Sequence, residues 1–458
     1  ALACLFFAAK AHMALTLCDG SPATVLIVGS GPRARSLQMF EKMHALGVRT
    51  VVVDTPSSWV ADLEQAGIIH KHVALPGVAT DSQDAELACR IVEAVQDASI
   101  GEIHGVYNAY NKYLLISSLV GEFFGVITNS YDAVKQCVFK HKTRACLISA
   151  GLESWRSCSI TTTTEMEEAA ALMQYPAVLK PAKGSGSCGV VRVDSSEEAL
   201  AEFAKLKQLS WARSDDVVFI LEEYVDGPEF GVELVMQAGE VVFHSIMDAA
   251  KQTSGAYFQG TGRSCPSNES LAVQMMVVSH CITSVKALGL TTGVIDIDVR
   301  HSQFGPRIIE INARMGGGSV ATMHQLMYAM DLVEVHLKTI LGISVAGLAR
   351  SAPAALESCF EAGWVMSPHS GDVKDMGPFV KSLELMFQSH PNVVSIVPLV
   401  DDGASVTGYR EAALPSSLIQ VVTRASTKDV AMECLNMILC AAEERLAEVV
   451  PVFVLEEE

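Results

Sequence analysis

The strongest constraint on the fold is an apolar strand that runs directly into a glycine-rich turn. Residues 177–180 read Ala-Val-Leu-Lys, and glycines follow at positions 184, 186 and 189. Glycine tolerates positive φ and lets backbone amides approach a phosphate closely. Because Lys180 ends the apolar strand, its ammonium group is expected at a bound phosphate. The segment lacks the Gly-Lys-Ser/Thr of a Walker loop, and it predicts a hairpin whose tip grasps phosphate.

A second pair of expected strands places acids, an amide and an arginine on one face. Asp296 and Asp298 alternate along the first strand, and Glu310, Asn312 and Arg314 alternate along the second. Residues two apart in a strand face the same side. Carboxylate and amide oxygens suit Mg²⁺, with Mn²⁺ as an alternative. The pattern predicts a metal site at Asp298, Glu310 and Asn312, with Asp296 as a rival for Asp298. An arginine beside it can stabilise a phosphoryl group or an anionic intermediate.

The order of strands and helices predicts an α/β protein of several domains. Strands alternate with helices in the first third of the chain, which is typical of a doubly wound sheet. The grasp region is expected to be α+β, and the C-terminal part to be a small α+β closing domain. The predicted boundaries are a tail over 1–20, an α/β domain over 21–135, a central domain over 136–345 (lid about 136–220, metal-binding lobe about 221–345) and a closing domain over 346–458.

Composition excludes several classes of protein. The 458 residues carry a formal net charge of −19, which argues against nucleic-acid binding and against attraction to anionic membranes. No apolar run approaches the roughly 20 residues of a membrane helix. Twelve cysteines without regular spacing favour a reducing cytoplasm over a disulfide framework. The chain does not begin with methionine, as expected of a fragment or a processed product.

The order of the motifs resembles the ATP-grasp superfamily. Lys140 lies forty residues before Lys180, and Glu222 and Glu229 lie seven apart in Leu-Glu-Glu-Tyr-Val-Asp-Gly-Pro-Glu. The acid strand at Asp298 and the Glu-x-Asn-x-Arg sequence follow, so the resemblance spans roughly 136–345 and includes every main element. Each element alone is weak, whereas the ordered set is specific. Lys142 and Lys183 are rivals for the two lysines, but the forty-residue spacing favours Lys140 and Lys180.

The resemblance implies a role for each matching residue. Lys140 and Lys180 would contact ATP phosphates, Glu222 the adenine amine, the backbone of Tyr224 and Val225 the hinge, and Glu229 the ribose. The implied ATP-binding residues are Lys140, Lys180, Gly184, Ser185, Gly186, Ser187, Glu222, Tyr224, Val225 and Glu229. Asp298, Glu310 and Asn312 would bind magnesium, and Arg314 would be the catalytic residue that stabilises an acyl phosphate. Asp298 stands where the family more often has Glu, and its shorter reach implies a water bridge or a shifted metal.

The sequence after Asn312 looks most like carnosine synthases and related L-amino-acid ligases. Glycines follow Arg314 at positions 316–318, and a long loop precedes the helix that leads to residue 293. In that family the loop helps to form the amino-acid pocket, which makes Arg263 and Tyr257 weaker candidates for substrate binding, together with Gly316 and Gly317. The implied function is an ATP-dependent ligase that joins a small carboxylate and an amine, expected to be amino acids, through an acyl phosphate. Dimers are common in the family, so a homodimer is an expected partner.

Three alternatives compete with the ligase. The chain could be an ATP-binding regulatory protein on an ATP-grasp scaffold, although its metal ligands are intact. It could activate bicarbonate, although no biotin-carrier sequence is present. It could be an NAD-dependent oxidoreductase, because residues 29–34 fit the Gly-x-Gly-x-x-Ala fingerprint and Asp54 ends the next strand. The last alternative leaves the second half of the chain unexplained.

Overall fold

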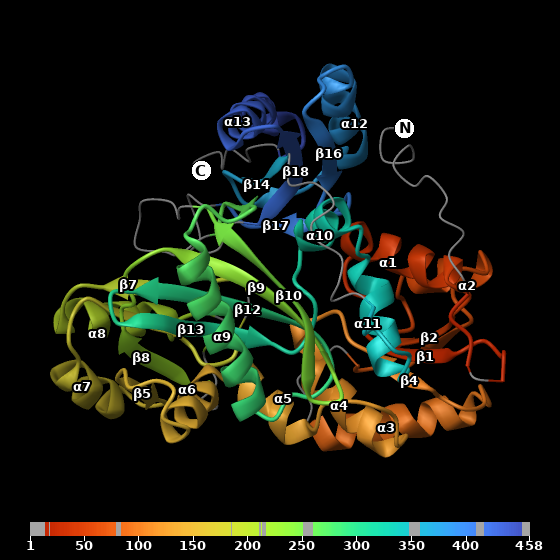
Figure 1. Ribbon diagram of the computed structural model, residues 1–458, viewed down its shortest axis with the longest axis horizontal. Helices are drawn as coiled ribbons and strands as arrows, with labels where there is room; N and C mark the ends of the chain where they lie inside the picture. Colours follow the sequence, from red (N-terminus) through yellow and green to blue (C-terminus); the bar gives the residue numbers. More distant parts are fainter. Residues whose placement is uncertain are drawn as a thin grey trace, which may run out of the picture.

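The structure is a computed structural model that describes residues 14–17, 19–78, 84–184, 186–209, 212, 217–250, 260–347, 358–408 and 416–450. Two of the predicted site residues, Ser185 and Tyr257, lie outside the described residues. Figure 1 shows three parts: an N-terminal α/β unit in red and orange, a small lid in yellow, and a central body that continues into the blue C-terminal part.

A parallel sheet of order β3-β2-β1-β4 forms the N-terminal unit. Alternate residues of β1 face two separate cores, Val25 and Ile27 on one side and Leu26 and Val28 on the other. Both faces are therefore covered, as the continuous apolar strand predicts, and the doubly wound arrangement is confirmed. The elements are β1 (Thr24–Val28), α1 (Arg33–Ala45), β2 (Arg49–Asp54), α2 (Val60–Gln65), β3 (Lys71–Ala74), α3 (Asp84–Asp97), β4 (Gly105–Tyr107), η1 (Asn111–Tyr113), α4 (Leu114–Phe123) and α5 (Tyr131–Val138).

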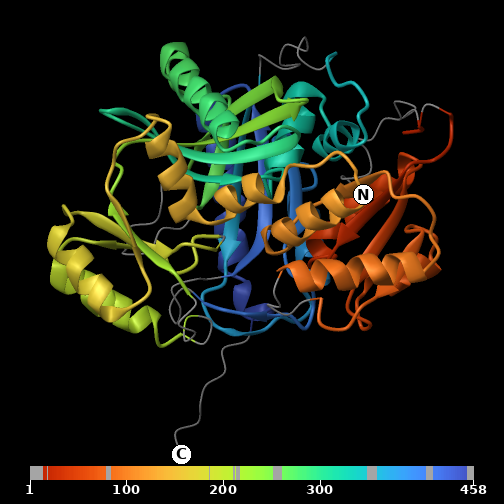
Figure 2. The same cartoon turned by 90° about the horizontal axis from the view of Figure 1, so that it is seen from below.

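The lid is an antiparallel sheet of order β5-β8-β6-β7. Strands β6 and β7 form the predicted hairpin on either side of the glycine loop. Thr162 and Glu165 form a capping box at the start of α7, and the Ser195 side chain caps α8. The elements are α6 (Lys140–Ser149), β5 (Ser157–Ile160), α7 (Thr163–Leu172), β6 (Ala177–Pro181), β7 (Val191–Val193), α8 (Ser196–Leu206) and β8 (Phe219–Glu223). Figure 2 shows the lid and the N-terminal unit on opposite sides of the central sheet.

One eight-stranded sheet, of order β13-β12-β9-β10-β11-β14-β18-β16, runs through the rest of the molecule. Its first part carries the predicted acid strands, and Ile295, Ile297 and Ile311 pack into the core beneath α9. The elements are β9 (Glu229–Gln237), β10 (Glu240–Ala249), β11 (Gly262–Cys265), α9 (Leu271–Ala287), β12 (Gly293–Ser302), β13 (Gly305–Asn312), α10 (Val320–Tyr328) and α11 (Leu332–Ile340).

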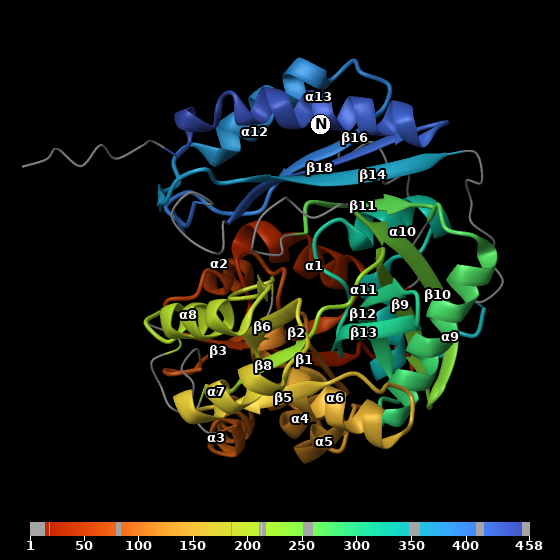
Figure 3. The same cartoon turned by 90° about the vertical axis from the view of Figure 1, so that its left-hand side faces the viewer.

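The C-terminal part extends the same sheet, because β14 pairs with β11. The sheet therefore crosses the boundary predicted at residue 346. Helices α12 and α13 cover its outer face, away from the other domains (Figure 3). The elements are β14 (Cys359–Met366), β15 (Gly371–Asp372), α12 (Met376–Phe387), β16 (Val393–Pro398), β17 (Ser405–Val406), β18 (Ser417–Ala425), α13 (Lys428–Glu443) and η4 (Leu446–Glu448). Among the helices described here, none has the length and apolar character needed to cross a membrane.

Candidate active site

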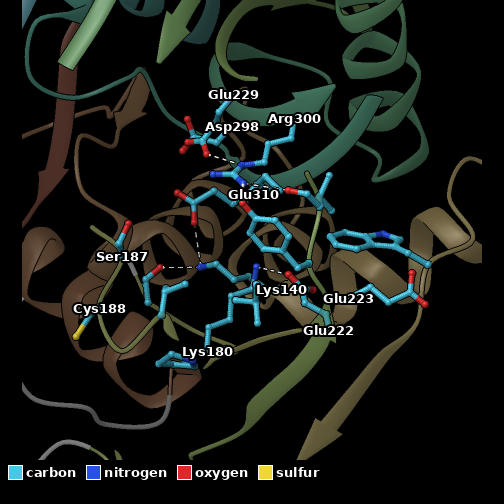
Figure 4. Close-up of a pocket in the computed structure, with 18 residues that line it drawn as sticks. Lys140, Lys180, Ser187, Cys188, Glu222, Glu223, Glu229, Asp298, Arg300 and Glu310 are labelled. Atoms are coloured by element: carbon cyan, nitrogen blue, oxygen red, sulfur yellow. Dashed lines mark hydrogen bonds and ion pairs between the residues drawn. The ribbon is translucent and has the colours of Figure 1, made fainter. Parts of the chain in front are cut away.

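A cavity lies between the lid sheet and the acid strands, and it encloses about 740 Å³ of space that is partly open to solvent. Strands β6 and β8 supply its lid side, and β12 and β13 supply the acids (Figure 4). It is lined by Lys140, Trp155, Val178, Lys180, Pro181, Gly184, Ser187, Cys188, Val190, Glu222, Glu223, Tyr224, Val225, Glu229, Asp298, Arg300, Ile309 and Glu310. Most of the predicted ATP-binding residues therefore face one space, together with two of the predicted metal ligands.

Lys180 is buried and is held by Glu222, with which it forms an ion pair. The other carboxylate oxygen of Glu222 accepts from Nε of Arg144 at 3.0 Å. Arg144 also donates to the carbonyl of Ile309 at 2.7 Å and lies 4.4 Å from the ring centroid of Trp155. Both oxygens of Glu222 are thus engaged by cations, so Glu222 anchors Lys180 here. Its contact with an adenine amine stays a prediction.

Lys140 joins the lysine side of the cavity to the acid side. Its Nζ lies 3.0 Å from Oε2 of Glu310 and donates to the carbonyl of Gly184 at 3.1 Å. Burial opposes ionisation of Glu310, but the Lys140 ammonium and the amide of Asn312 outweigh it and lower the pKa of Glu310 to about 2. Glu310 is therefore a carboxylate at every physiological pH.

Asp298 stands directly opposite Glu310 in the sheet and opposite Gly231 on its other side. Its Oδ1 lies 2.8 Å from Nη2 of Arg263, whose guanidinium passes over Gly231. A side chain at position 231 would press against this guanidinium. Glycine at this position therefore allows Arg263 to reach from β11 to Asp298. Burial and the neighbouring carboxylates raise the pKa of Asp298 to about 8, although Arg263 opposes the shift.

Asp296 faces Arg314, not the cavity. Nη1 of Arg314 lies 3.2 Å from Oδ2 of Asp296, and Nδ2 of Asn312 donates to the same oxygen at 3.3 Å. Asn111 of the N-terminal unit accepts from Nε of Arg314 and donates to Oδ1 of Asn312 at 2.9 Å. Of the two rival acids, Asp298 lines the cavity beside Glu310. We therefore place Asp298 ahead of Asp296 as a metal ligand.

Gly316, two residues after Arg314, approaches a buried carboxyl group. The amide of Gly316 donates to Oε1 of Glu233 at 2.8 Å, and a Cβ at position 316 would lie 2.2 Å from that oxygen. Gly317, in contrast, has no atom within 4 Å of such a Cβ. Burial and the neighbouring Asp296 raise the pKa of Glu233. Gly316 is thus required by a close approach, which fixes the chain just beyond Arg314.

Arg300 organises the far end of the cavity. Its Nε lies 2.9 Å from Oε2 of Glu229, and its Nη1 donates to the carbonyl of Val225 at 3.0 Å and to the hydroxyl of Tyr224 at 3.2 Å. The guanidinium therefore ties β12 to the segment between β8 and β9 that was predicted to hold adenine and ribose.

The described part of the glycine loop borders the cavity at Gly184 and Ser187. Gly186 has φ 64°, and Ser187 also adopts positive φ, at 60°. This left-handed backbone turns the loop back toward β7, and it is the conformation for which glycine was predicted at position 186.

The space beside the glycines of the dinucleotide fingerprint is occupied by side chains of the N-terminal unit itself. A Cβ at Gly29 would lie 2.0 Å from the ring of Tyr113, and one at Gly31 would lie 2.2 Å from the ring of Tyr110. Asp54 accepts from the amide of Ser30 at 3.0 Å. The two rings occupy the place where a pyrophosphate would approach the glycines, so the loop serves packing within its domain.

Three functional candidates were missing from the sequence-based prediction. Arg300 lies two residues after Asp298, so the alternation along the strand was a signal for it. Arg144 lies one helical turn after Lys140, a spacing that places both on one face of α6. Asn111 is brought to the acids only by the packing of the N-terminal unit, and no local pattern indicates it.

The acid strands fit a divalent cation held jointly with phosphate. Across the described ranges, no three acidic, histidine or cysteine side chains gather closely enough to hold an ion by themselves. Asp298 and Glu310 are cross-strand neighbours, and Asn312 follows on the same face. Two carboxylates and an amide suit Mg²⁺, which usually keeps water and substrate phosphates as its other ligands.

Comparison with known proteins agrees with this geometry. The profile of the ATP-grasp domain matches residues 173–323. The chain carries an ATP-grasp domain. The fold of the L-amino acid ligase from Bacillus licheniformis is similar, with a TM-score of 0.71 and 20% identity over 92% of this chain and 97% of that chain. The ATP-grasp fold class predicted from the motifs is therefore confirmed.

Two curated relatives match over part of their length. The uncharacterized protein y4rH of Sinorhizobium fredii is 31% identical over 258 residues, which cover 54% of this chain and 52% of that protein. Carnosine synthase 1 of Homo sapiens is 22% identical over 343 residues, which cover 70% of this chain and 40% of that protein. The chain thus spans about half or less of the length of these relatives. The predicted resemblance to carnosine synthases and L-amino-acid ligases is confirmed.

Proposed function

We propose that the protein is an ATP-dependent carboxylate–amine ligase that forms an amide bond through an acyl phosphate. The observation that carries the proposal is the Lys140–Glu310 ion pair of 3.0 Å, which joins the phosphate-binding side of the cavity to the metal-binding side. Lysines beside acids on opposing elements are what a nucleotide with a divalent cation requires. We further propose that amino acids are among the substrates, because carnosine synthase 1 and an L-amino acid ligase are among the proteins it resembles.

Each group has a definite task in this reaction. A carboxylate oxygen of the substrate attacks the γ-phosphorus of ATP, the bond to the ADP oxygen breaks, and an acyl phosphate forms. Lys140 and Lys180 neutralise the phosphate oxygens. The loop around Gly186 excludes water that would hydrolyse the acyl phosphate. Asp298, Glu310 and Asn312 would hold Mg²⁺, which lowers the negative charge on the phosphoryl group when bound. Arg314 stabilises the anion formed when the amine attacks and phosphate leaves.

The setting of the enzyme is also a proposal. The ten cysteines that the structure describes are free, which fits a reducing compartment such as the cytoplasm. A homodimer is proposed from the resemblance alone.

Phosphate release from Mg-ATP tests the function. We expect release that depends on a particular pair of acid and amine, measured with amino acids and other small acids singly and in pairs. A regulatory protein would bind ATP without any release, and a carboxylase would require bicarbonate in place of the amine. Either result would contradict the ligase.

The pH dependence of ATP use is expected to follow Lys180. Burial lowers the pKa of Lys180 to about 8, with Glu222 opposing the shift and Arg144 adding to it. Because only the protonated amine neutralises phosphate, kcat/KM for ATP should fall as pH rises through about 8. This parameter reports groups of the free enzyme, so its pH profile contains the ionisation of Lys180 together with that of Asp298, whose pKa is also raised to about 8.

Two variants should move this fall in kcat/KM at alkaline pH, the alkaline limb of the profile, in opposite directions. Glu222→Gln removes the carboxylate that favours the charged amine, so the pKa of Lys180 and the limb should move to lower pH. Arg144→Met removes a nearby positive charge, so the limb should move to higher pH. General loss of packing would shift both variants alike, and a common direction would exclude Lys180 as the titrating group.

A further inference from the structure

The side chain of Asn111 joins the N-terminal unit to the acid strands. It lies in η1, and its partners Asn312 and Arg314 follow 201 and 203 residues later in the chain. Its Nδ2 donates to Oδ1 of Asn312 at 2.9 Å, and its Oδ1 accepts from Nε of Arg314. Both ends of this one amide group are therefore used by residues of another domain.

The glycines of the dinucleotide fingerprint hold the turn that carries Asn111. Two tyrosine rings flank Asn111 in the sequence, and both pack against this loop. A Cβ at Gly31 would lie 2.2 Å from the ring of Tyr110, and one at Gly29 would lie 2.0 Å from the ring of Tyr113. The fingerprint, which these rings close to a pyrophosphate, thus gives Asn111 a fixed base.

The chemistry of donors and acceptors determines which way each amide points. Arginine has only donors, so the oxygen of Asn111 faces Arg314 and its NH₂ group faces Asn312. The oxygen of Asn312 therefore faces Asn111. Its own Nδ2 lies toward the acids, 3.3 Å from Oδ2 of Asp296 and 3.2 Å from Oε1 of Glu310. Every contact in this relay joins a donor to an acceptor.

The orientation of Asn312 decides whether it can bind a cation. A side-chain amide binds a hard cation such as Mg²⁺ through its oxygen, because its nitrogen is only a donor. The oxygen of Asn312 has two lone pairs, and the bond from Asn111 uses one of them. A metal bound by Glu310 competes for the carboxylate that now accepts from Nδ2 of Asn312. The shorter bond from Asn111 is therefore the contact that continues to orient the amide.

We propose that Asn111 is a positioning residue, which holds the amide of Asn312 with its oxygen available to Mg²⁺. This inference rests on the proposed ligase function, because it assigns part of the metal site of that reaction to the N-terminal unit. Hydrogen-bond partners that orient a metal ligand typically change metal affinity about 10–100-fold when they are removed. The ATP-grasp domain then depends on the preceding domain for a complete metal site.

Binding of Mn²⁺ in the presence of ADP tests this role without turnover. Bound Mn²⁺ is measured by the enhancement of water-proton relaxation, which is larger on the protein than in the free complex of Mn²⁺ with ADP. Asn111→Ala should weaken the binding of Mn²⁺ about 10–100-fold. The side chain is half-buried, so the substitution creates no overpacking.

Asn129→Ala is the matched control. Asn129 is also half-buried and also ties the N-terminal unit to the central body, but away from the acids. It donates to the carbonyl of Thr292 and accepts from the amide of Thr291, both at 2.8 Å. This variant should keep the affinity for Mn²⁺, and an equal loss in both variants would overturn the proposal, because loosened packing of the domain would then explain the effect.

A double-variant cycle shows whether Asn111 acts through Asn312. In that case Asn111→Ala combined with Asn312→Ala should bind Mn²⁺ no more weakly than Asn312→Ala alone. Additive losses, or an unchanged affinity in Asn111→Ala, would overturn the proposal and leave the ligase standing. If the unaltered protein bound no Mn²⁺ in the presence of ADP, the metal site and the ligase function would be overturned together.

Discussion

Glu310→Gln is expected to lower kcat by about 10²–10³-fold, the cost of losing one preorganised electrostatic contact to the transferred group. The substitution keeps the shape of the side chain and an oxygen that can accept from Nδ2 of Asn312, now 3.2 Å from Oε1 of Glu310. It removes the charge that pairs with Lys140 and that would hold the metal. The low pKa of Glu310, about 2, means that this charge is present throughout the working pH range.

Steady-state turnover against the concentration of Mg²⁺ measures this effect. Glu240→Gln is the matched control, because Glu240 is exposed on β10 and forms a comparable pair of 3.0 Å with Lys286. It should change activity little, since surface ion pairs contribute only about 0–1 kcal/mol. Turnover of Glu310→Gln close to that of Glu240→Gln would remove Glu310 from the reaction.

The cations and acids of the site neutralise one another before any nucleotide binds. The pairs are Lys140–Glu310, Lys180–Glu222, Arg300–Glu229 and Arg314–Asp296. Arg263 contacts Asp298, whose charge is present only above its raised pKa of about 8. Buried charges without partners would be costly, so pairing keeps the empty cavity stable. When ATP and metal bind, phosphate oxygens replace the acids as partners of the cations, and the metal replaces the cations as partner of the acids. The paired side chains already lie beside the cavity, so this exchange needs little movement.

Local periodicity was sufficient to predict the elements that carry the site. The strand that carries Lys180 and the alternation of Glu310 with Asn312 are both found in the structure, because side chains in a strand alternate between faces whatever the tertiary context. The same rule extended by one step would have included Arg300. Sequence alone also indicated the glycine at position 316, but not the carboxyl group of Glu233 that requires it.

Long-range packing decided what the sequence could not. Asn111 reaches Arg314 across 203 residues of chain, and Arg144 reaches Ile309 across 165. The pairing of β11 with β14 likewise joins the C-terminal strands to the central sheet, although the change of character near residue 350 suggested a separate domain. Such contacts depend on how domains pack, and no short motif encodes them.

Gly316→Ala is expected to lower kcat/KM about 100-fold, because a displacement near 1 Å beside a catalytic group has an effect of that size. The new Cβ would lie 2.2 Å from Oε1 of Glu233 and 2.9 Å from both methyl groups of Val320, so the backbone must shift. Arg314 lies two residues earlier and would move with it. Overpacking of this kind also lowers the free energy of unfolding by about 1–3 kcal/mol.

Gly317→Ala separates this close approach from a general effect of replacing glycine. Its Cβ would meet no atom within 4 Å, so the free energy of unfolding should change by no more than about 0.5 kcal/mol. Urea denaturation and kcat/KM of both variants provide the comparison. If Gly316→Ala unfolds at the same urea concentration as Gly317→Ala and keeps full activity, the contact with Glu233 does not position Arg314. If only Gly316→Ala loses both stability and activity, the buried carboxyl group of Glu233 acts on the reaction through the backbone that follows Arg314.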